Sequence, residues 1–118
     1  MISETEKGTQ AVVGHHLQAM TVDDILTDYS EDSVLFTADG PVRGLAGVRA
    51  FFEAFTKSIT PEIMVAYKLV RMDVVGETAY ILWKAEPFVL LGTDTFVVHS
   101  GKIVAQSFTG YMPAESHP

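Results

Sequence analysis

The sequence predicts an α+β domain in which helices come first and an antiparallel sheet follows. Apolar residues recur at helical spacing as far as residue 55, and they alternate with a period of two after Thr60-Pro61. Turn signals in the second half, at Gly76-Glu77, Gly92-Thr93 and Ser100-Gly101, follow one another too closely for crossover helices. We therefore expect neighbouring strands to pair antiparallel, as a meander.

Three helices are predicted in the first half. The first rests on an apolar stripe made of Val12, Val13, His16, Leu17 and Met20. The second begins at Thr21, an N-cap residue with an acid, Asp24, three positions later. The third covers residues 44–55, where helical spacing is kept by Leu45, Val48, Phe52 and Phe55.

Five strands are predicted around and after these helices. A short β-prone run at 33–37 closes in the turn cluster 38–41, where Gly40 and Pro41 oppose continuation. The other four strands are placed at 62–75, 78–91, 94–99 and 102–112. We interpret residues 1–118 as a single domain and 113–118 as a frayed tail.

Composition excludes several classes of partner. The formal net charge is −7 and the eight basic residues are scattered, so no basic stripe is present and nucleic acid is not expected as a partner. The absence of cysteine excludes disulfides and thiolate chemistry. No apolar run approaches the ~18 residues of a membrane span, and the acidic N-terminus is unlike a signal peptide, so we expect no membrane partner and a cytoplasmic location.

An acid on an apolar strand face is the first candidate for chemistry. Alternation places Asp94 on the same face as Phe96 and Val98. If that face is buried, desolvation favours the neutral carboxyl, which can donate a hydrogen bond. The alternative is a rim residue that accepts hydrogen bonds from the backbone of the turn at Gly92-Thr93.

His16 is the second candidate, because it lies inside the apolar stripe of the first helix. A neutral imidazole hydrogen-bonded to Asp94 or to a ligand would suit acid–base work near neutral pH. The alternative is a core histidine satisfied by one partner. His15 and His16 diverge by about 100° on a helix and cannot share a metal. With no glycine-rich phosphate loop either, neither a metal nor a cofactor is predicted.

Trp83 offers an indole N–H and a flat face for a ring-containing ligand. It shares a strand face with Ile81. One bulge in this strand would turn the opposite face inward, with Leu82, Lys84 and Glu86. Burial of Lys84 would require a partner, which favours Trp83 as the inward residue.

Taken in order, these elements resemble the SnoaL-like branch of the NTF2-like superfamily over residues 9–112. The matching segments are Asp28-Tyr29-Ser30-Glu31-Asp32-Ser33-Val34, Gly40-Pro41-Val42-Arg43-Gly44, Val48-Arg49-Ala50-Phe51-Phe52, Asp94-Thr95-Phe96-Val97-Val98 and Gly101-Lys102-Ile103-Val104. The resemblance implies a cystatin-like cone, with three N-terminal helices packed on a curved antiparallel sheet around an internal hydrophobic pocket. It also implies a homodimer formed through the outer face of the sheet.

Similarity to ketosteroid isomerase within this superfamily implies roles for individual positions. The oxyanion-hole Asp falls on Asp94 and the oxyanion-hole Tyr on His16. The catalytic base falls on Thr37, which cannot abstract a carbon-bound proton. Asp39, two residues further on, could act from a displaced position or lie at the rim.

The same alignment places Gln106 on the inner face, where it would orient a polar ligand. Trp83, Phe96 and Phe108 would hold the carbon skeleton, and Phe52 completes the predicted substrate-binding set with Thr37 and Asp39.

The sequence therefore predicts a small-molecule pocket protein that takes a small hydrophobic, oxygenated ligand. As an enzyme it would be a cofactor-free isomerase, cyclase or dehydratase resembling ketosteroid isomerase or polyketide cyclase. Asp94 with His16 would stabilise or relay charge on a substrate oxygen. The alternative is a non-catalytic ligand-binding or dimeric association module of the same fold. Thr37 favours this alternative, because no base stands where relatives keep one.

Overall fold

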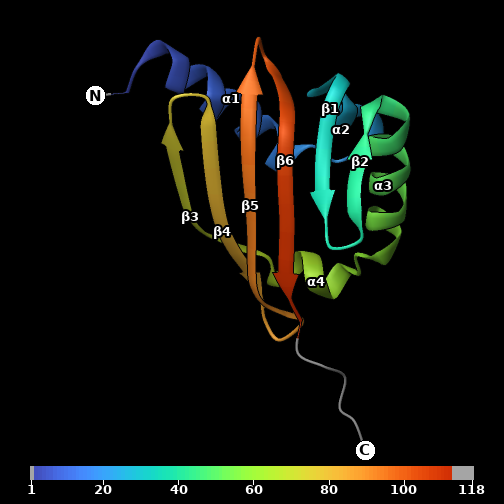
Figure 1. Ribbon diagram of the computed structural model, residues 1–118. Coiled ribbons are helices and arrows are strands. Elements are labelled where there is room, and N and C mark those ends of the chain that lie inside the picture. The colour runs from blue at the N-terminus through green and yellow to red at the C-terminus, as the bar shows by residue number, and fades with distance from the viewer. Residues whose placement is uncertain (1, 113–118) are drawn as a thin grey trace, which may run out of the picture.

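A curved six-stranded sheet forms the body of the protein in this computed structural model, which describes residues 2–112 (Figure 1). The strands are β1 (Tyr29–Thr37), β2 (Gly40–Arg43), β3 (Lys68–Val75), β4 (Thr78–Ala85), β5 (Val89–His99) and β6 (Lys102–Tyr111). They lie side by side in the order β2-β1-β6-β5-β4-β3. The helices of residues 2–112 are α1 (Glu4–Gln18), α2 (Val22–Leu26), α3 (Gly44–Ser58) and α4 (Pro61–Ala66).

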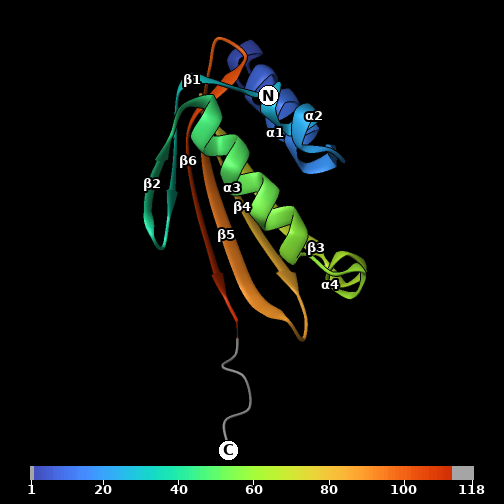
Figure 2. The same cartoon turned by 90° about the vertical axis from the view of Figure 1, so that its right-hand side faces the viewer.

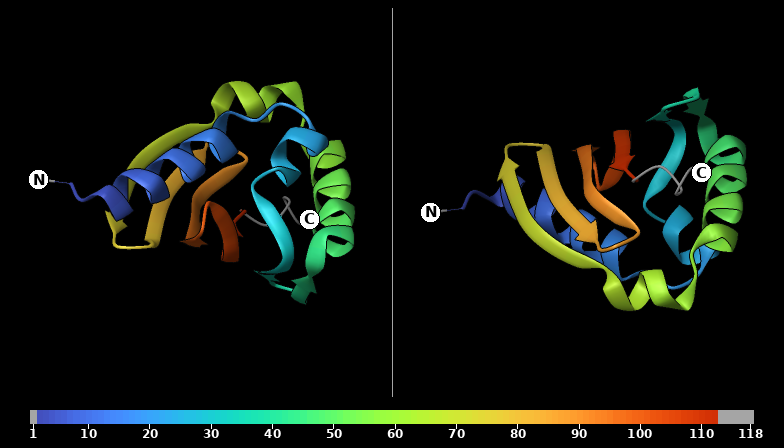
Figure 3. Two further views of the ribbon diagram at one scale, coloured as in Figure 1. Left: turned by 90° about the horizontal axis from the view of Figure 1, so that it is seen from above. Right: turned by 90° about the horizontal axis from the view of Figure 1, so that it is seen from below.

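The helices gather on the concave side of the sheet (Figures 2 and 3). Helix α1 packs across β3, β4 and β5, whereas α3 packs on β1 and β2. The core lies between these layers and includes the fully buried side chains of Val13, Val48 and Phe96. Such burial is the main source of stability, at about 25 cal/mol per Å² of apolar surface. No helix within residues 2–112 is long and apolar enough to cross a membrane.

The α+β class and the cone architecture are confirmed, but the sheet is mixed rather than antiparallel. Strand β1 runs parallel to β6, with Leu35 opposite Gln106. The intervening helices and meander bring the chain back to β1 in the same direction, a pairing that turn spacing within the meander does not report. The predicted turn cluster at 38–41 is partly strand, because β2 forms a hairpin with β1.

Helix α4 replaces the first part of the predicted strand 62–75. The Thr60 side chain accepts a hydrogen bond from the backbone N–H of Ile63 at 3.1 Å, and Pro61 occupies the first helical turn. An N-cap followed by proline favours a helix over the apolar run Ile63-Met64-Val65. The three predicted N-terminal helices are therefore joined by a fourth.

The predicted turn at Gly92-Thr93 is wrong, because β5 runs through it without a break. The chain turns instead at residues 86–88, and β4 ends at Ala85 rather than at 91. Gly92 is needed because a Cβ there would lie 2.2 Å from Cε2 of Trp83 on the neighbouring strand. Asp94 consequently lies in the middle of a strand, not at its beginning.

Candidate functional site

The side chain of Asp94 is buried on the concave face of β5, and the residue is 7% exposed. The indole Nε1–H of Trp83 donates to its Oδ1 at 2.9 Å. The Nε2–H of Gln106 donates to its Oδ2 at 2.9 Å. The carboxyl is thus fixed from both neighbouring strands, β4 and β6. The predicted rim position, in which Asp94 would cap a turn, is wrong.

Tyr29 extends this arrangement into a chain of hydrogen bonds across the sheet. Its hydroxyl donates to Oε1 of Gln106. With the amide oxygen engaged by Tyr29, the amide nitrogen of Gln106 faces Asp94. Four strands therefore contribute to one buried polar cluster, which we call the Asp94 cluster: Tyr29, Trp83, Asp94 and Gln106.

Burial sets the protonation states in the Asp94 cluster. Desolvation raises the pKa of Asp94 from 3.8 to about 6, although the hydrogen bonds from Trp83 and Gln106 lower it. Burial and the charge of Asp94 raise the pKa of the Tyr29 hydroxyl, which stays protonated and donates. Asp94 can therefore exchange a proton near neutral pH, which is what general acid–base work requires.

His16 lies beside the Asp94 cluster in an aromatic cage. Its ring meets those of Tyr29, Phe52 and Phe96 edge-on, at centroid distances of 5.9, 5.8 and 5.4 Å. Its Nδ1 is buried without a hydrogen-bond partner among the described residues. Burial lowers the pKa of His16 to about 4, so the imidazole is neutral at pH 7. No hydrogen bond joins His16 to Asp94 in residues 2–112, so that expected contact is not formed.

The inward face of β4 carries Ile81, Trp83 and Ala85, all of which are buried. Lys84 on the opposite face pairs with Glu86 at 3.4 Å near the surface. The alternative in which Lys84 and Glu86 face inward is therefore wrong, and the prediction that Trp83 faces inward is confirmed.

Further aromatic rings cover Trp83. The ring of Phe108 lies parallel to the indole within 2°, with centroids 6.4 Å apart. Tyr67, which follows α4, contacts the indole at 5.6 Å and is 41% exposed. Burial and the charge of Asp94 raise the pKa of Tyr67. Tyr67 is therefore a partly exposed side chain close enough to Asp94 to sense its charge.

Thr37 and Asp39 belong to the turn between β1 and β2. The Thr37 hydroxyl donates to the carbonyl oxygen of Gly40 at 2.9 Å and accepts from the backbone N–H of Asp39 at 3.1 Å. The Asp39 residue is exposed. Neither side chain is hydrogen-bonded to the Asp94 cluster. Phe52 and Phe96 lie in the core against His16, and Phe108 is half-buried.

Two open hollows of about 370 Å³ each lie on the surface of the described part of the chain. One lies between α2 and α3 and is lined by Asp23, Leu26, Thr27, Leu45, Ala46 and Arg49. The other lies on α4 and is lined by Pro61, Glu62, Val65 and Ala66. Neither borders Asp94, so the internal pocket expected there is not confirmed.

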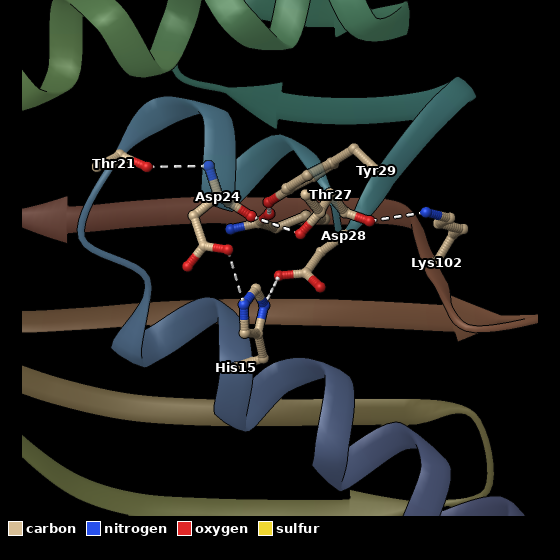
Figure 4. Close-up of polar contacts among 8 residues, drawn as sticks. His15, Thr21, Asp24, Thr27, Asp28, Tyr29 and Lys102 are labelled. Carbon is tan, nitrogen blue, oxygen red and sulfur yellow. Dashed lines mark hydrogen bonds and ion pairs between the residues drawn. The ribbon is translucent and has the colours of Figure 1, made fainter.

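A second polar cluster, which sequence reasoning missed, lies at the surface end of the same region (Figure 4). His15 reaches from α1 to two carboxylates: its Nδ1 is 2.7 Å from Asp28 Oδ2 and its Nε2 is 3.1 Å from Asp24 Oδ1. Lys102 of β6 donates to the carbonyl oxygen of Thr27 at 2.7 Å. Within residues 2–112, no three His, Asp or Glu side chains are placed to hold a metal ion.

Sequence reasoning also missed Tyr29 and Tyr67 as members of the site. The helical spacing of Val22, Ile25, Leu26 and Tyr29 favours a place for Tyr29 on the second helix, yet it is the first residue of β1. The strand preference of tyrosine is the one local signal for an earlier start of β1, and the polar residues Ser30, Glu31 and Asp32 that follow oppose it. Nothing in the local sequence of Tyr67 distinguishes a core tyrosine from one that covers Trp83.

A curved sheet that wraps around helices, with polar groups converging on its concave face, defines the NTF2-like class of fold. Residues 10–106 match the family model of the SnoaL-like domain, and the chain belongs to this family. No curated protein matches the chain significantly.

Solved structures of the same class are similar over almost the whole chain. An NTF2-like protein of unknown function from Burkholderia xenovorans has 14% identity and a TM-score of 0.73, and the match covers 98% of this chain and 91% of that one. A proposed polyketide cyclase from Sinorhizobium meliloti has 16% identity and a TM-score of 0.70, with coverage of 84% and 94%. A proposed ketosteroid isomerase from Kribbella flavida has 13% identity and a TM-score of 0.66, with coverage of 96% and 84%. At such identities the likeness establishes the fold alone.

Proposed function

We propose that this protein binds a small hydrophobic molecule bearing an oxygen function and acts on it by cofactor-free acid–base chemistry at Asp94. The reaction would be of the isomerase, cyclase or dehydratase type. The observation that carries the proposal is a carboxyl group that is buried among aromatic rings, is held by two N–H donors and has a pKa of about 6. A group poised near neutrality can both accept and return a proton during turnover.

Each neighbour of Asp94 has a role in this proposal. Trp83 and Phe108 offer flat apolar surface for the carbon skeleton of the ligand. Each oxygen of Asp94 accepts one protein hydrogen bond and keeps further acceptor capacity for a ligand hydroxyl. Neutral His16, whose Nδ1 has no partner among the described residues, can accept or donate one hydrogen bond to a polar atom of the ligand.

Entry of the ligand would require movement of a covering side chain, and Tyr67 is our candidate. It is partly exposed, contacts Trp83 and follows a short helix with no buried residue. Side chains of this kind change rotamer at low cost compared with fully buried ones.

A non-catalytic ligand-binding or association module is the second candidate function. Thr37 supports it, because its hydroxyl is engaged within the turn and no second proton-transfer group faces Asp94 from that position. The two candidates differ in one measurable respect: only the enzyme should exchange protons on a bound carbonyl compound.

Trp83 is the single tryptophan of the chain, so its fluorescence reports directly on the site. We would titrate the protein with 4-nitrophenol, a flat phenol that can donate to Asp94, and compare it with the Asp94→Asn, His16→Phe and Asp32→Asn variants. Loss of a hydrogen bond to a charged group costs about 1.5–3 kcal/mol, so Asp94→Asn should weaken binding about tenfold or more. Asp32, an exposed acid, serves as the control and should leave binding unchanged. Equal affinity in wild type and Asp94→Asn would refute the site.

Catalysis is tested separately with 2-cyclohexenone in D₂O, by following loss of its α-proton signals in NMR. Asp94-dependent exchange supports the enzyme. Phenol binding that depends on Asp94 without any exchange favours the binding module instead.

A further inference from the structure

We propose that His15 and Asp28 form a positioning pair, which holds His16 and Tyr29 in register at the candidate site and does so in a pH-dependent way. The importance of this pair for activity rests on the proposed function. The contacts and the test below involve no ligand.

The pair joins two points of the chain that each lead directly into the site. His15 immediately precedes His16 in α1, and Asp28 immediately precedes Tyr29 at the start of β1. The next residues on each side, His16 and Tyr29, meet edge-on at a centroid distance of 5.9 Å. Adjacent helical side chains diverge by about 100°, so His15 can face outward to Asp28 while His16 faces inward. Figure 4 shows His15 bridging from α1 to the segment that precedes β1.

The two sides of this pair are anchored differently. The start of β1 is tied firmly to β6, because Ile103 donates its backbone N–H to the carbonyl oxygen of Asp28 at 2.7 Å. Helix α1, in contrast, buries only Thr9 and Val13. Val12 and Leu17 are only partly buried against the core, so a specific polar bond to the segment before β1 adds to what holds the C-terminal half of α1 in position. A bond of 2.7 Å between a histidine ring and a largely buried carboxylate can supply it.

The pair is sensitive to protonation because both ring nitrogens of His15 face carboxylate oxygens. A neutral imidazole has one N–H and can donate to one of them, whereas the protonated ring donates to both. The titratable and charged groups around the pair are Asp24 of α2, Lys102 of β6 and His16 on the same helix.

The direction of the pH dependence follows from the surroundings of each partner. The hydrogen bond and charge of Asp28 raise the pKa of His15, so the contribution of the pair is complete below pH 6.5 and is lost as the pH rises through that higher value. Burial raises the pKa of Asp28, whereas the hydrogen bond and charge of His15 lower it, so the protonated ring favours the ionised carboxylate. Above the pKa of His15, the ring loses its charge and one of its two N–H donors, so α1 is held less firmly over the site.

The test is an NMR titration of the histidine and tyrosine ring signals between pH 5 and 9, without ligand. His16 itself titrates near pH 4 and Asp94 near pH 6, so the titration is repeated in Asp94→Asn, where a step in the His16 or Tyr29 signals at the pKa of His15 comes from His15. We expect that step in the wild type. In Asp28→Asn the titration of His15 should move to lower pH, and the step in His16 should move with it.

The matched control is Glu77→Gln, which removes the partner of another histidine, His99, at a comparable 3.0 Å on the surface. It should leave the His16 and Tyr29 signals as in the wild type. If Asp28→Asn does not fold, His15→Gln asks the same question, because glutamine cannot titrate and the step in His16 must then disappear.

The proposal is overturned if the His16 and Tyr29 signals ignore the titration of His15, if Asp28→Asn leaves that titration in place, or if the step survives in His15→Gln. None of these results bears on phenol binding or proton exchange, so failure of the pair and failure of the proposed function are distinguishable.

Discussion

Gly92→Ala should disrupt the candidate site more than a Cβ added at either other glycine of the sheet, Gly40 or Gly110. A Cβ at Gly92 would lie 2.2, 2.4 and 2.6 Å from three ring atoms of Trp83. Ordinary contact begins at 3.4 Å, so the indole must move by about 1.2 Å. The ring is confined by Phe108 and Tyr67, and a shift of that size takes Nε1 out of hydrogen-bond reach of Asp94, which it now meets at 2.9 Å.

The expected cost has two parts and one offset. Overpacking of a filled core costs about 1–3 kcal/mol. Loss of the N–H donor to a buried carboxyl costs a further 1.5–3 kcal/mol or so. Replacement of glycine in a strand returns about 0.5–1 kcal/mol of backbone entropy. The net destabilisation should therefore be about 3 kcal/mol.

Urea unfolding followed by Trp83 fluorescence measures this cost, and the midpoint should fall by about 1.5 M at an m-value of about 2 kcal/mol/M. The control is Gly110→Ala, directly opposite Gly92 on β6, where the nearest atom to the new Cβ is 3.6 Å away. That variant should be neutral or slightly more stable. In Gly92→Ala the pKa of Asp94 should also rise, because the Trp83 bond that lowers it is lost. If both variants unfold at the wild-type midpoint, Trp83 does not lie across Gly92 as described.

Two further predictions concern pH and assembly. Desolvation raises the pKa of Asp94 to about 6, so its ionisation removes about 3 kcal/mol of folding stability as the pH rises from about 4 to 6. Burial lowers the pKa of His16 to about 4, so its protonation removes stability as the pH falls through 6.5 towards 4. The two effects oppose each other between about pH 4 and 6.5. In Asp94→Asn the free energy of unfolding should therefore rise with pH, and in His16→Phe it should fall. Wild-type pH profiles of thermal or urea unfolding in both variants would contradict these predictions. We also propose a homodimer through the outer sheet face, which exposes Tyr80, Leu91 and Tyr111. Thr95→Lys at the centre of that face should give a monomer in light scattering, because a charge buried in the interface would be unpaired, and a dimeric variant or a monomeric wild type would refute it.

Hydrophobic periodicity was sufficient to predict which way a side chain points wherever that orientation depends on the residue's own strand or helix. Alternation correctly placed Asp94 on the same inner face as Phe96. The cost of burying Lys84 then favoured Trp83 as the inward residue of β4. These positions follow from a single strand and one buried face, which is what a two-residue period reports.

Periodicity failed where the decisive contact comes from another part of the chain. Gly92 resembles a turn residue in the sequence, but its role is to leave room for an indole on the next strand. Tyr29 could not be placed by alternation, because the pairing of β1 with β6 shifts register between Tyr29 and Val34. The helix at Pro61–Ala66 could have been predicted locally, because Thr60-Pro61 is a helix-start signal. The strand prediction gave more weight to the apolar run that follows.

The direction of the hydrogen bonds explains why Asp94, although buried, is not simply a protonated core acid. The protonated Tyr29 hydroxyl donates to Oε1 of Gln106, and the amide nitrogen of Gln106 donates to Asp94. Asp94 thereby receives two N–H groups, both of which favour its ionised form, while burial favours its neutral form. The two influences leave the pKa near 6, between an ordinary surface acid and one held permanently neutral. A hydrophobic residue at position 106 would leave Asp94 Oδ2 and the Tyr29 hydroxyl without these partners, so the amide keeps a buried carboxyl able to exchange its proton.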